Sequence, residues 1–251
     1  MKDFFINDYM VYRFKGVDVF FKFEGEGQGR PLVLLHGWGR SSDDFEEFVS
    51  FFPNQRILTI DFPPFGQSGS NLKDWNIYTY VSMVISLCEH LKINEADFLG
   101  HSFGGRIAII LSCVRSSLVH SCILVDSAGL KPKRSIKYKI NLSFYKLNRK
   151  LGLPVKDRSS ADYKALSPAM KETFKSIVNT HLDNYAKHMK TCTLIVWGKN
   201  DKETPLYMAK KINKLIKNSR LEIIENGGHF CFLECPLEFF SIIYEFLNEK
   251  H

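Results

Sequence analysis

The feature that most constrains this chain is a serine flanked by glycines. Residues 100–104 read Gly-His-Ser-Phe-Gly and fit the pattern G-x-S-x-G. An apolar, strand-like run over residues 96–99 precedes the pattern, and a helix-like stretch over residues 106–111 follows it. In a strand, sharp turn and helix of this kind, the serine is exposed at the top of a sheet. The glycines let the backbone crowd together without Cβ clashes. We therefore predict that Ser102 is a catalytic nucleophile.

Apolar strand-like runs alternate with helix-like stretches along most of the chain. Strands are predicted at residues 17–23, 32–35, 56–61, 96–99, 123–126, 193–197 and 221–224, and helices at 41–51, 77–91, 106–111 and 236–247. Continuous apolar strands separated by helices predict an α/β fold, with a mostly parallel central sheet and helices on both faces. The ligand site of such a sheet lies beyond the carboxyl ends of its strands.

One long segment interrupts this alternation. Residues 131–187 contain 14 Lys and Arg against four Asp and Glu, a net charge of +10 within a chain of net charge +7. We interpret this segment as an inserted, basic helical cap (lid) over the site. The predicted core domain then comprises residues 1–130 and 188–251. A positive cap favours anionic substrates or an anionic membrane surface, whereas the alternative is that its lysines only solvate exposed helices.

Length and composition predict one globular enzyme domain in the cytoplasm. The 251 residues are 45% hydrophobic and 24% charged, which is ordinary for a single α/β domain. Acidic residues interrupt the apolar N-terminus where a signal peptide would be continuous. No run approaches the roughly 18 apolar residues of a membrane helix, so no integral membrane association is expected.

A pI near 9.0 without a recognition motif does not support nucleic-acid binding.

Six scattered cysteines agree with a reducing compartment. Cys231 and Cys235 have a spacing that could serve a metal or redox pair, but no second pair supports it. We predict that they pack in or near the core, and we expect no metal and no cofactor.

A serine hydroxyl needs a base to take its proton and an acid to orient that base. His229 follows the last predicted strand in a glycine loop and is the candidate base. Asp201, which follows the strand at 193–197, is the candidate acid. Asp126, at the end of the strand after the serine, is a rival for this role, and Glu203 is a weaker one.

The oxyanion that forms during acyl transfer needs hydrogen-bond donors. The backbone N–H of Phe103, directly after the serine, is one candidate donor. The second is the backbone N–H of Trp38, in the loop after the strand at 32–35. We expect His36 to shape that loop through hydrogen bonds and to do no chemistry.

Together these motifs resemble the α/β-hydrolase superfamily over nearly the whole chain outside the cap. The resemblance rests on His-Gly-Trp at residues 36–38, on the turn at residues 61–68, on residues 100–105, and on the order serine, acid, histidine. The turn departs from the family pattern because Pro64 stands where a glycine is usual. A serine at the elbow is unlike the epoxide hydrolases and haloalkane dehalogenases, which carry aspartate there. The resemblance implies a cofactor-free, capped hydrolase.

The implied reaction is acyl transfer through an acyl-enzyme, with a small-molecule carboxylic ester as the leading substrate. Enzymes with the same motifs also include thioesterases, lipases, carbon–carbon bond hydrolases and perhydrolases or haloperoxidase-like enzymes, and these stay open as alternatives. Some members of the fold bind ligands without turnover, which is a further alternative. The sequence does not set the oligomeric state.

Overall fold

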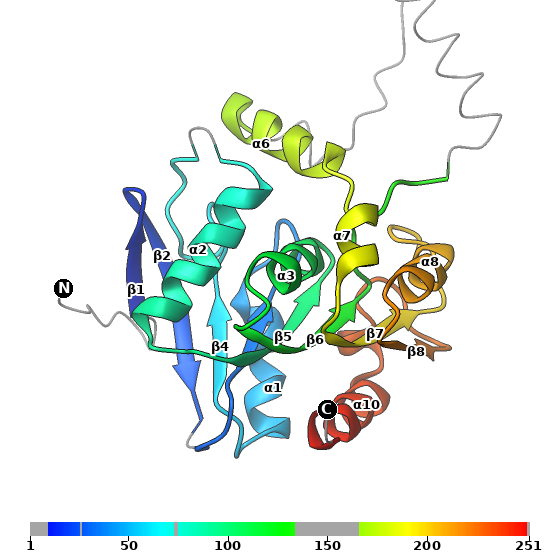
Figure 1. Ribbon diagram of the computed structural model, residues 1–251. Helices are drawn as coiled ribbons and strands as arrows, with labels where there is room; N and C mark the ends of the chain where they lie inside the picture. Colours follow the sequence, from blue (N-terminus) through cyan, green and yellow to red (C-terminus); the bar gives the residue numbers. More distant parts are fainter. Residues whose placement is uncertain (1–9, 26, 73–74, 134–165, 250–251) are drawn as a thin grey trace, which may run out of the picture.

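The computed structural model describes residues 10–25, 27–72, 75–133 and 166–249. Its centre is an eight-stranded sheet with the strand order β1-β2-β4-β3-β5-β6-β7-β8 (Figure 1). The strands are β1 (Met10–Phe14), β2 (Val17–Glu24), β3 (Leu32–Leu35), β4 (Ile57–Ile60), β5 (Ala96–His101), β6 (Val119–Val125), β7 (Cys192–Gly198) and β8 (Ser219–Ile224).

The sheet is parallel from β4 through β8, and β1 and β2 form an antiparallel edge. The predicted mostly parallel sheet is therefore confirmed. Strand β1 lies outside the predicted elements and pairs with β2 through a tight turn at Lys15 and Gly16, where both residues have positive φ. All residues of β3, β4 and β5 are buried, as continuous apolar strands covered on both faces must be.

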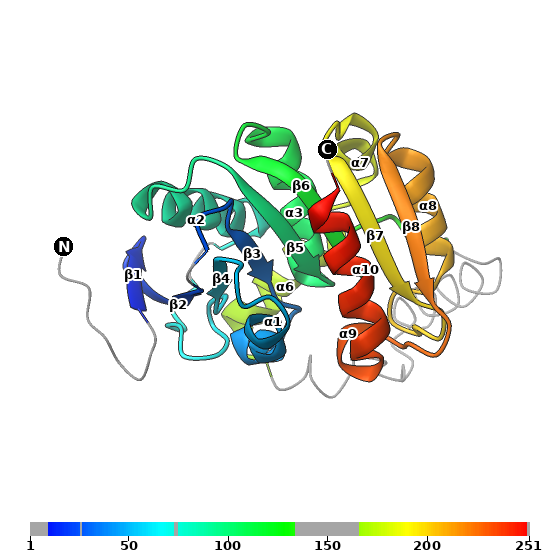
Figure 2. The same cartoon turned by 90° about the horizontal axis from the view of Figure 1, so that it is seen from below.

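Helices cover both faces of the sheet (Figures 1 and 2). They are η1 (Ser42–Phe45), α1 (Glu46–Phe51), α2 (Ile77–His90), α3 (Phe103–Val114), α6 (Pro168–Asn179), α7 (Asp183–His188), α8 (Tyr207–Leu215), α9 (Cys231–Glu234) and α10 (Pro236–Asn248). One hydrophobic cluster fills the space between the sheet and α2, α3, α7 and α8. A second cluster lies on the opposite face beneath α1, α9 and α10, and it includes Cys231. Cys231 is buried and Cys235 half-buried, both with free thiols, in keeping with the predicted core packing.

Local capping fixes where the helices begin. The Asn76 side chain accepts hydrogen bonds from the backbone N–H groups of Tyr78 and Thr79 and so caps α2. The Thr79 hydroxyl accepts one in return from the Asn76 backbone, which completes a capping box. Ser167 caps α6 by accepting from the Met170 N–H.

Two helices of the predicted cap fall within the described residues, whereas residues 134–165 lie outside them. Helix α6 lies beyond the carboxyl edge of the sheet (Figure 1). Helix α7 instead packs against α3 and α8, and Leu182 and Ala186 are fully buried there. The described part of the segment thus divides between a helix over the sheet edge and a helix on the core.

Candidate active site

Ser102 occupies a strained turn between β5 and α3. Its backbone has φ 48° and ψ −103°, a region that residues with a Cβ rarely adopt. The turn is closely packed, because a Cβ on Gly104 would lie 1.9 Å from the Leu35 carbonyl oxygen. A Cβ on Gly100 would lie 2.5 Å from the Gly104 carbonyl oxygen. The glycines on both sides of Ser102 are therefore required by close backbone approach, as the sequence pattern predicts.

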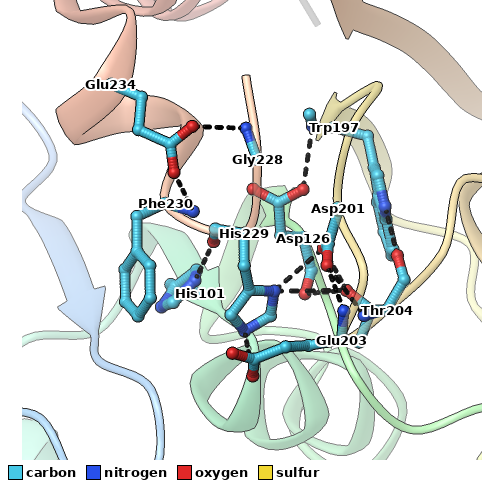
Figure 3. Close-up of polar contacts among 11 residues, drawn as sticks. His101, Asp126, Trp197, Asp201, Glu203, Thr204, Gly228, His229, Phe230 and Glu234 are labelled. Carbon is cyan, nitrogen blue, oxygen red and sulfur yellow. Dashed lines mark hydrogen bonds and ion pairs between the residues drawn. The ribbon is translucent and has the colours of Figure 1, made fainter. Parts of the chain in front are cut away.

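His229 lies in the loop between β8 and α9, and its imidazole contacts Asp201 (Figure 3). The Nδ1 atom of His229 is 2.8 Å from Asp201 Oδ2. The other oxygen, Oδ1, accepts backbone N–H groups from Glu203 at 2.7 Å and Thr204 at 2.9 Å. These bonds fix the carboxylate in the turn after β7, with Oδ2 directed at the imidazole.

Neither rival acid contacts Nδ1 of His229. Asp126 Oδ1 accepts the backbone N–H of Gly198 at 2.9 Å, and no hydrogen bond joins Asp126 to His229 among the described residues. Glu203 does contact His229, but at the opposite nitrogen, with 3.4 Å between Nε2 and Oε2. Of the three carboxylates, Asp201 is the one that meets Nδ1.

Asp201 and His229 shift each other's pKa. Burial works to raise the pKa of Asp201, but hydrogen bonds from His229 and Thr204 outweigh it, and the pKa is lowered. Burial works to lower the pKa of His229, but the hydrogen bond and charge of Asp201, with the charge of Glu203, raise it above the usual value of 6.5. Asp201 is thus ionised at neutral pH and supports a positive charge on His229.

Ser102 and His229 open into one cavity of about 570 Å³. Trp38 and Phe103, the sequence-predicted oxyanion donors, line the same cavity. Neither backbone N–H donates to another residue within the described ranges. No hydrogen bond joins Ser102 to His229 in the described part of the chain. Catalytic hydrogen bonds are often long in a free enzyme and shorten when substrate binds.

His36 has the structural position that the sequence analysis gives it. Its Nδ1 lies 2.7 Å from the Gly37 carbonyl oxygen, and its Nε2 accepts the backbone N–H of Phe62 at 2.8 Å. Burial lowers its pKa, so the ring stays neutral and ties the Trp38 loop to the turn after β4. His36 does not line the cavity.

Asp61 organises that turn. Its two carboxylate oxygens accept the backbone N–H groups of Ser42 at 2.8 Å and Gln67 at 2.9 Å. A Cβ on Gly66 would lie 2.0 Å from Asp61 Oδ2, so glycine is needed at that position. The turn places Phe65 against Trp38, with ring centroids 4.9 Å apart, in the wall of the cavity.

Three residues that support His229 have no role in the sequence analysis. His101 Nε2 donates to the His229 carbonyl oxygen at 2.8 Å, and burial lowers the pKa of His101 to about 3. The Thr204 hydroxyl lies 2.6 Å from Asp201 Oδ2 and 3.0 Å from the Asp126 carbonyl oxygen. Glu234 Oε2 accepts the Gly228 N–H at 2.5 Å and so holds the histidine loop onto α9. Of these three residues, only His101 has a sequence signal, because it lies within the serine motif at residues 100–104.

The described residues contain no group of three or more His, Cys, Asp and Glu side chains that could hold a metal ion. None of the helices described is long and apolar enough to cross a membrane.

Comparison with known proteins gives relatives over nearly the whole chain. The monoacylglycerol lipase ABHD6 of Rattus norvegicus is 26% identical, over 92% of this chain and 79% of the relative. The 2-hydroxymuconate semialdehyde hydrolase of Pseudomonas sp. (strain CF600) is 24% identical, over 89% of this chain and 88% of the relative. A solved hydrolase from Pseudomonas aeruginosa PA01 superposes with a TM-score of 0.79 at 17% identity, covering 97% of this chain and 99% of that one.

The relatives named above are hydrolases, and the solved structure shares the fold. The family model described as the alpha/beta hydrolase fold matches residues 30–157, which include the Trp38 loop and the serine elbow. The eight-stranded sheet, the strained serine turn and this match agree, and the chain belongs to the α/β-hydrolase family.

Proposed function

We propose that this protein is a serine hydrolase that cleaves carboxylic esters of small molecules through an acyl-enzyme. The observation that carries the proposal is the 2.8 Å contact between Asp201 Oδ2 and His229 Nδ1, in the same cavity as Ser102 at its strained turn. A nucleophile, a base and an acid that orients the base are the components that acyl transfer needs.

In the first half of the reaction, Ser102 Oγ forms a bond to the ester carbonyl carbon while its proton passes to His229 Nε2. Asp201 holds the proton on Nδ1, which leaves the Nε2 lone pair free to act as the base. The tetrahedral intermediate then breaks the bond to the alcohol oxygen, which leaves with the proton from Nε2. Water, deprotonated by His229, attacks the acyl-enzyme, releases the acid and restores Ser102.

The negative oxygen of each tetrahedral intermediate needs donors that are already in place. We assign this role to the backbone N–H groups of Trp38 and Phe103. Both residues line the cavity, and both N–H groups are without an acceptor in the described part of the protein. Loss of one such donor typically costs about 10²–10³ in turnover.

Hydrolysis of a carbon–carbon bond is the second candidate, because the similar proteins include both a monoacylglycerol lipase and a 2-hydroxymuconate semialdehyde hydrolase. The two reactions can use the same serine, histidine and aspartate, so substrate profiling separates them. We favour esters because the cavity wall at α6 is largely apolar, with Phe174, Ile177 and Val178 suited to an acyl chain.

The test is hydrolysis of p-nitrophenyl esters of increasing acyl length by the wild type and by Ser102→Ala, Asp201→Ala and His229→Ala. Activity in the wild type that all three variants lose supports the proposal. Ring-cleavage products with a vinylogous 1,5-diketone serve as the carbon–carbon substrate. Turnover of these compounds without ester turnover would replace the ester assignment, and no turnover of either class together with no fluorophosphonate labelling of Ser102 would refute it.

A further inference from the structure

A buried arginine lies next to the serine on the wall of the cavity. Arg106 follows Ser102 by four residues, one turn along α3, and both line the same cavity. The residues of α3 from Phe103 to Ser112 are all buried, and Arg106 is only 8% exposed. Placing a guanidinium in such a helix is costly unless its charge is compensated.

The hydrogen bonds that Arg106 makes to other described residues are to neutral groups. Its Nη1 donates to the carbonyl oxygens of Ile177 at 2.9 Å and Thr180 at 3.0 Å, at the C-terminal end of α6. These carbonyls carry only the partial negative charge of a helix end. No carboxylate pairs with Arg106 among the described residues, and no bond from its Nε or Nη2 is found there.

The other charged side chains on the cavity wall each have a partner of opposite charge. Arg40 pairs with Asp44. Glu203 pairs with His229, which also pairs with Asp201. Arg106 is thus the cationic group of the wall whose charge the described protein leaves uncompensated. Burial lowers its pKa to about 10, so it is still protonated at neutral pH.

We propose that Arg106 is the anion-binding residue of the substrate site, and that the preferred substrates are esters whose acyl chain carries a carboxylate. The guanidinium has five N–H donors in a planar fork that matches a carboxylate. Nη1 holds the two carbonyls of α6, which leaves Nε and Nη2 as the donors for an anion in the cavity that Arg106 lines. This inference rests on the proposed ester hydrolysis, but the binding site itself does not need turnover.

The test compares ester pairs of equal acyl length that differ in one charge. Mono-p-nitrophenyl adipate carries a terminal carboxylate, and p-nitrophenyl hexanoate has the same six-carbon chain without it. The wild type is expected to show a kcat/KM for the adipate ester at least tenfold above that for the hexanoate ester. Arg106→Gln should reduce this ratio by about 10- to 100-fold, the range expected for loss of a charge-assisted hydrogen bond.

Glutamine is chosen because its amide can still donate to the α6 carbonyls. If Arg106 only positioned α6, Arg106→Gln would lower kcat/KM for both esters alike and leave the ratio unchanged. Arg106→Lys keeps the charge and should retain part of the preference. Lys187→Gln removes a positive charge from an exposed position on α7 and should leave the ratio at the wild-type value. A wild type that prefers the hexanoate ester would overturn the proposal, even if no Arg106 variant folds.

A binding measurement separates this inference from the proposed function. In Ser102→Ala protein, calorimetry with monomethyl adipate and with methyl hexanoate measures affinity without turnover. Tighter binding of the adipate that disappears in Ser102→Ala/Arg106→Gln supports the anion site even if no ester is hydrolysed. If Ser102→Ala and Ser102→Ala/Arg106→Gln bind monomethyl adipate with equal affinity, the anion site is overturned. Ester hydrolysis by the wild type would still support the proposed function in that case.

Discussion

The Nε2 atom of His229 lies 3.4 Å from Oε2 of Glu203, while its Nδ1 lies 2.8 Å from Oδ2 of Asp201. One imidazole thus lies between two carboxylates (Figure 3). This arrangement stabilises the protonated ring, and the pKa of His229 is raised accordingly. In the proposed mechanism, His229 must lose that proton, and its Nε2 must exchange Glu203 for the serine hydroxyl, before Ser102 can be activated.

Glu203→Gln is therefore expected to move the acid limb of the kcat/KM profile to lower pH. Removing the negative charge beside Nε2 makes the imidazolium less stable, so the base is free at a lower pH. The shift should be well below one pH unit, because the Glu203 side chain is 69% exposed and water screens its charge. The measurement is kcat/KM for a neutral ester from pH 5 to pH 9.

A charge-matched control separates this contact from the general field of the protein. Glu225 is exposed and pairs with Lys199 away from the cavity. Glu225→Gln should leave the acid limb in place. An equal shift in the two variants, or a shift of Glu203→Gln to higher pH, would show that the contact with Nε2 does not tune the base.

Asp201→Asn should lower kcat by roughly 10³–10⁴, the loss expected when the orienting acid of such a triad is neutralised. The asparagine amide favours the wrong imidazole tautomer, with the proton on Nε2. Asp126→Asn should change kcat by less than about tenfold, because Asp126 bonds Gly198 and not His229. Single-turnover kinetics of both variants decide the role, and a large loss in Asp126→Asn alone would transfer the orienting role to Asp126.

The same two variants should change the pH dependence of stability in opposite directions. Burial raises the pKa of Asp126 from 3.8 to about 8, so between these values the folded protein holds a proton that the unfolded chain has lost. Stability that depends on this group falls as pH rises through that window. Asp126→Asn should remove the fall and make the free energy of unfolding less dependent on pH.

For Asp201 the sign is reversed, because its pKa is lowered from 3.8. Its contribution is present above the unfolded pKa and is lost as pH falls through the folded one. Asp201→Asn should therefore lose stability at neutral pH relative to the wild type. Urea unfolding at pH 4.5 and pH 8 brackets the Asp126 window, and a second series from pH 4.5 down to pH 2 covers the Asp201 window, which lies below 3.8. Parallel pH dependence in the wild type and Asp126→Asn would mean that Asp126 does not hold a proton in the folded protein.

Much of the fold could be predicted because its strands are continuous apolar runs. Strand β3 consists of four fully buried residues, and its sequence, Leu-Val-Leu-Leu, is typical of a strand covered on both faces. Strand β1 was missed because its residues are mostly half-buried, without clean alternation, and a Lys-Gly turn gives a weak hairpin signal. Helix α8 was missed because only Met208, Ala209 and Ile212 of its nine residues are buried, among exposed and half-buried polar neighbours.

The site could be predicted only in part. The order along the chain identified Ser102, Asp201 and His229 as candidates, since each follows a strand on one edge of the sheet. Distances between groups far apart in the chain have no sequence signal. The bonds from Arg106 to carbonyls of α6 span more than seventy residues, and they depend on how that helix lies on the core. The contact of Glu203 with Nε2 of His229 likewise depends on how the turn after β7 folds, and the sequence carries no signal for that distance.

Gly104→Ala should destabilise the protein by about 3 kcal/mol, the upper end of the usual cost of overpacking a core. The new Cβ would lie 1.9 Å from the Leu35 carbonyl oxygen, which is a backbone atom of the fully buried strand β3. Gly29→Ala is the matched control, because nothing lies within 4 Å of a Cβ there and its φ is ordinary. That variant should stay within about 0.5 kcal/mol of the wild type. Chemical denaturation of both variants tests the close approach at the elbow. If Gly104→Ala were as stable as Gly29→Ala, β3 and α3 would have to lie further apart than the structure places them.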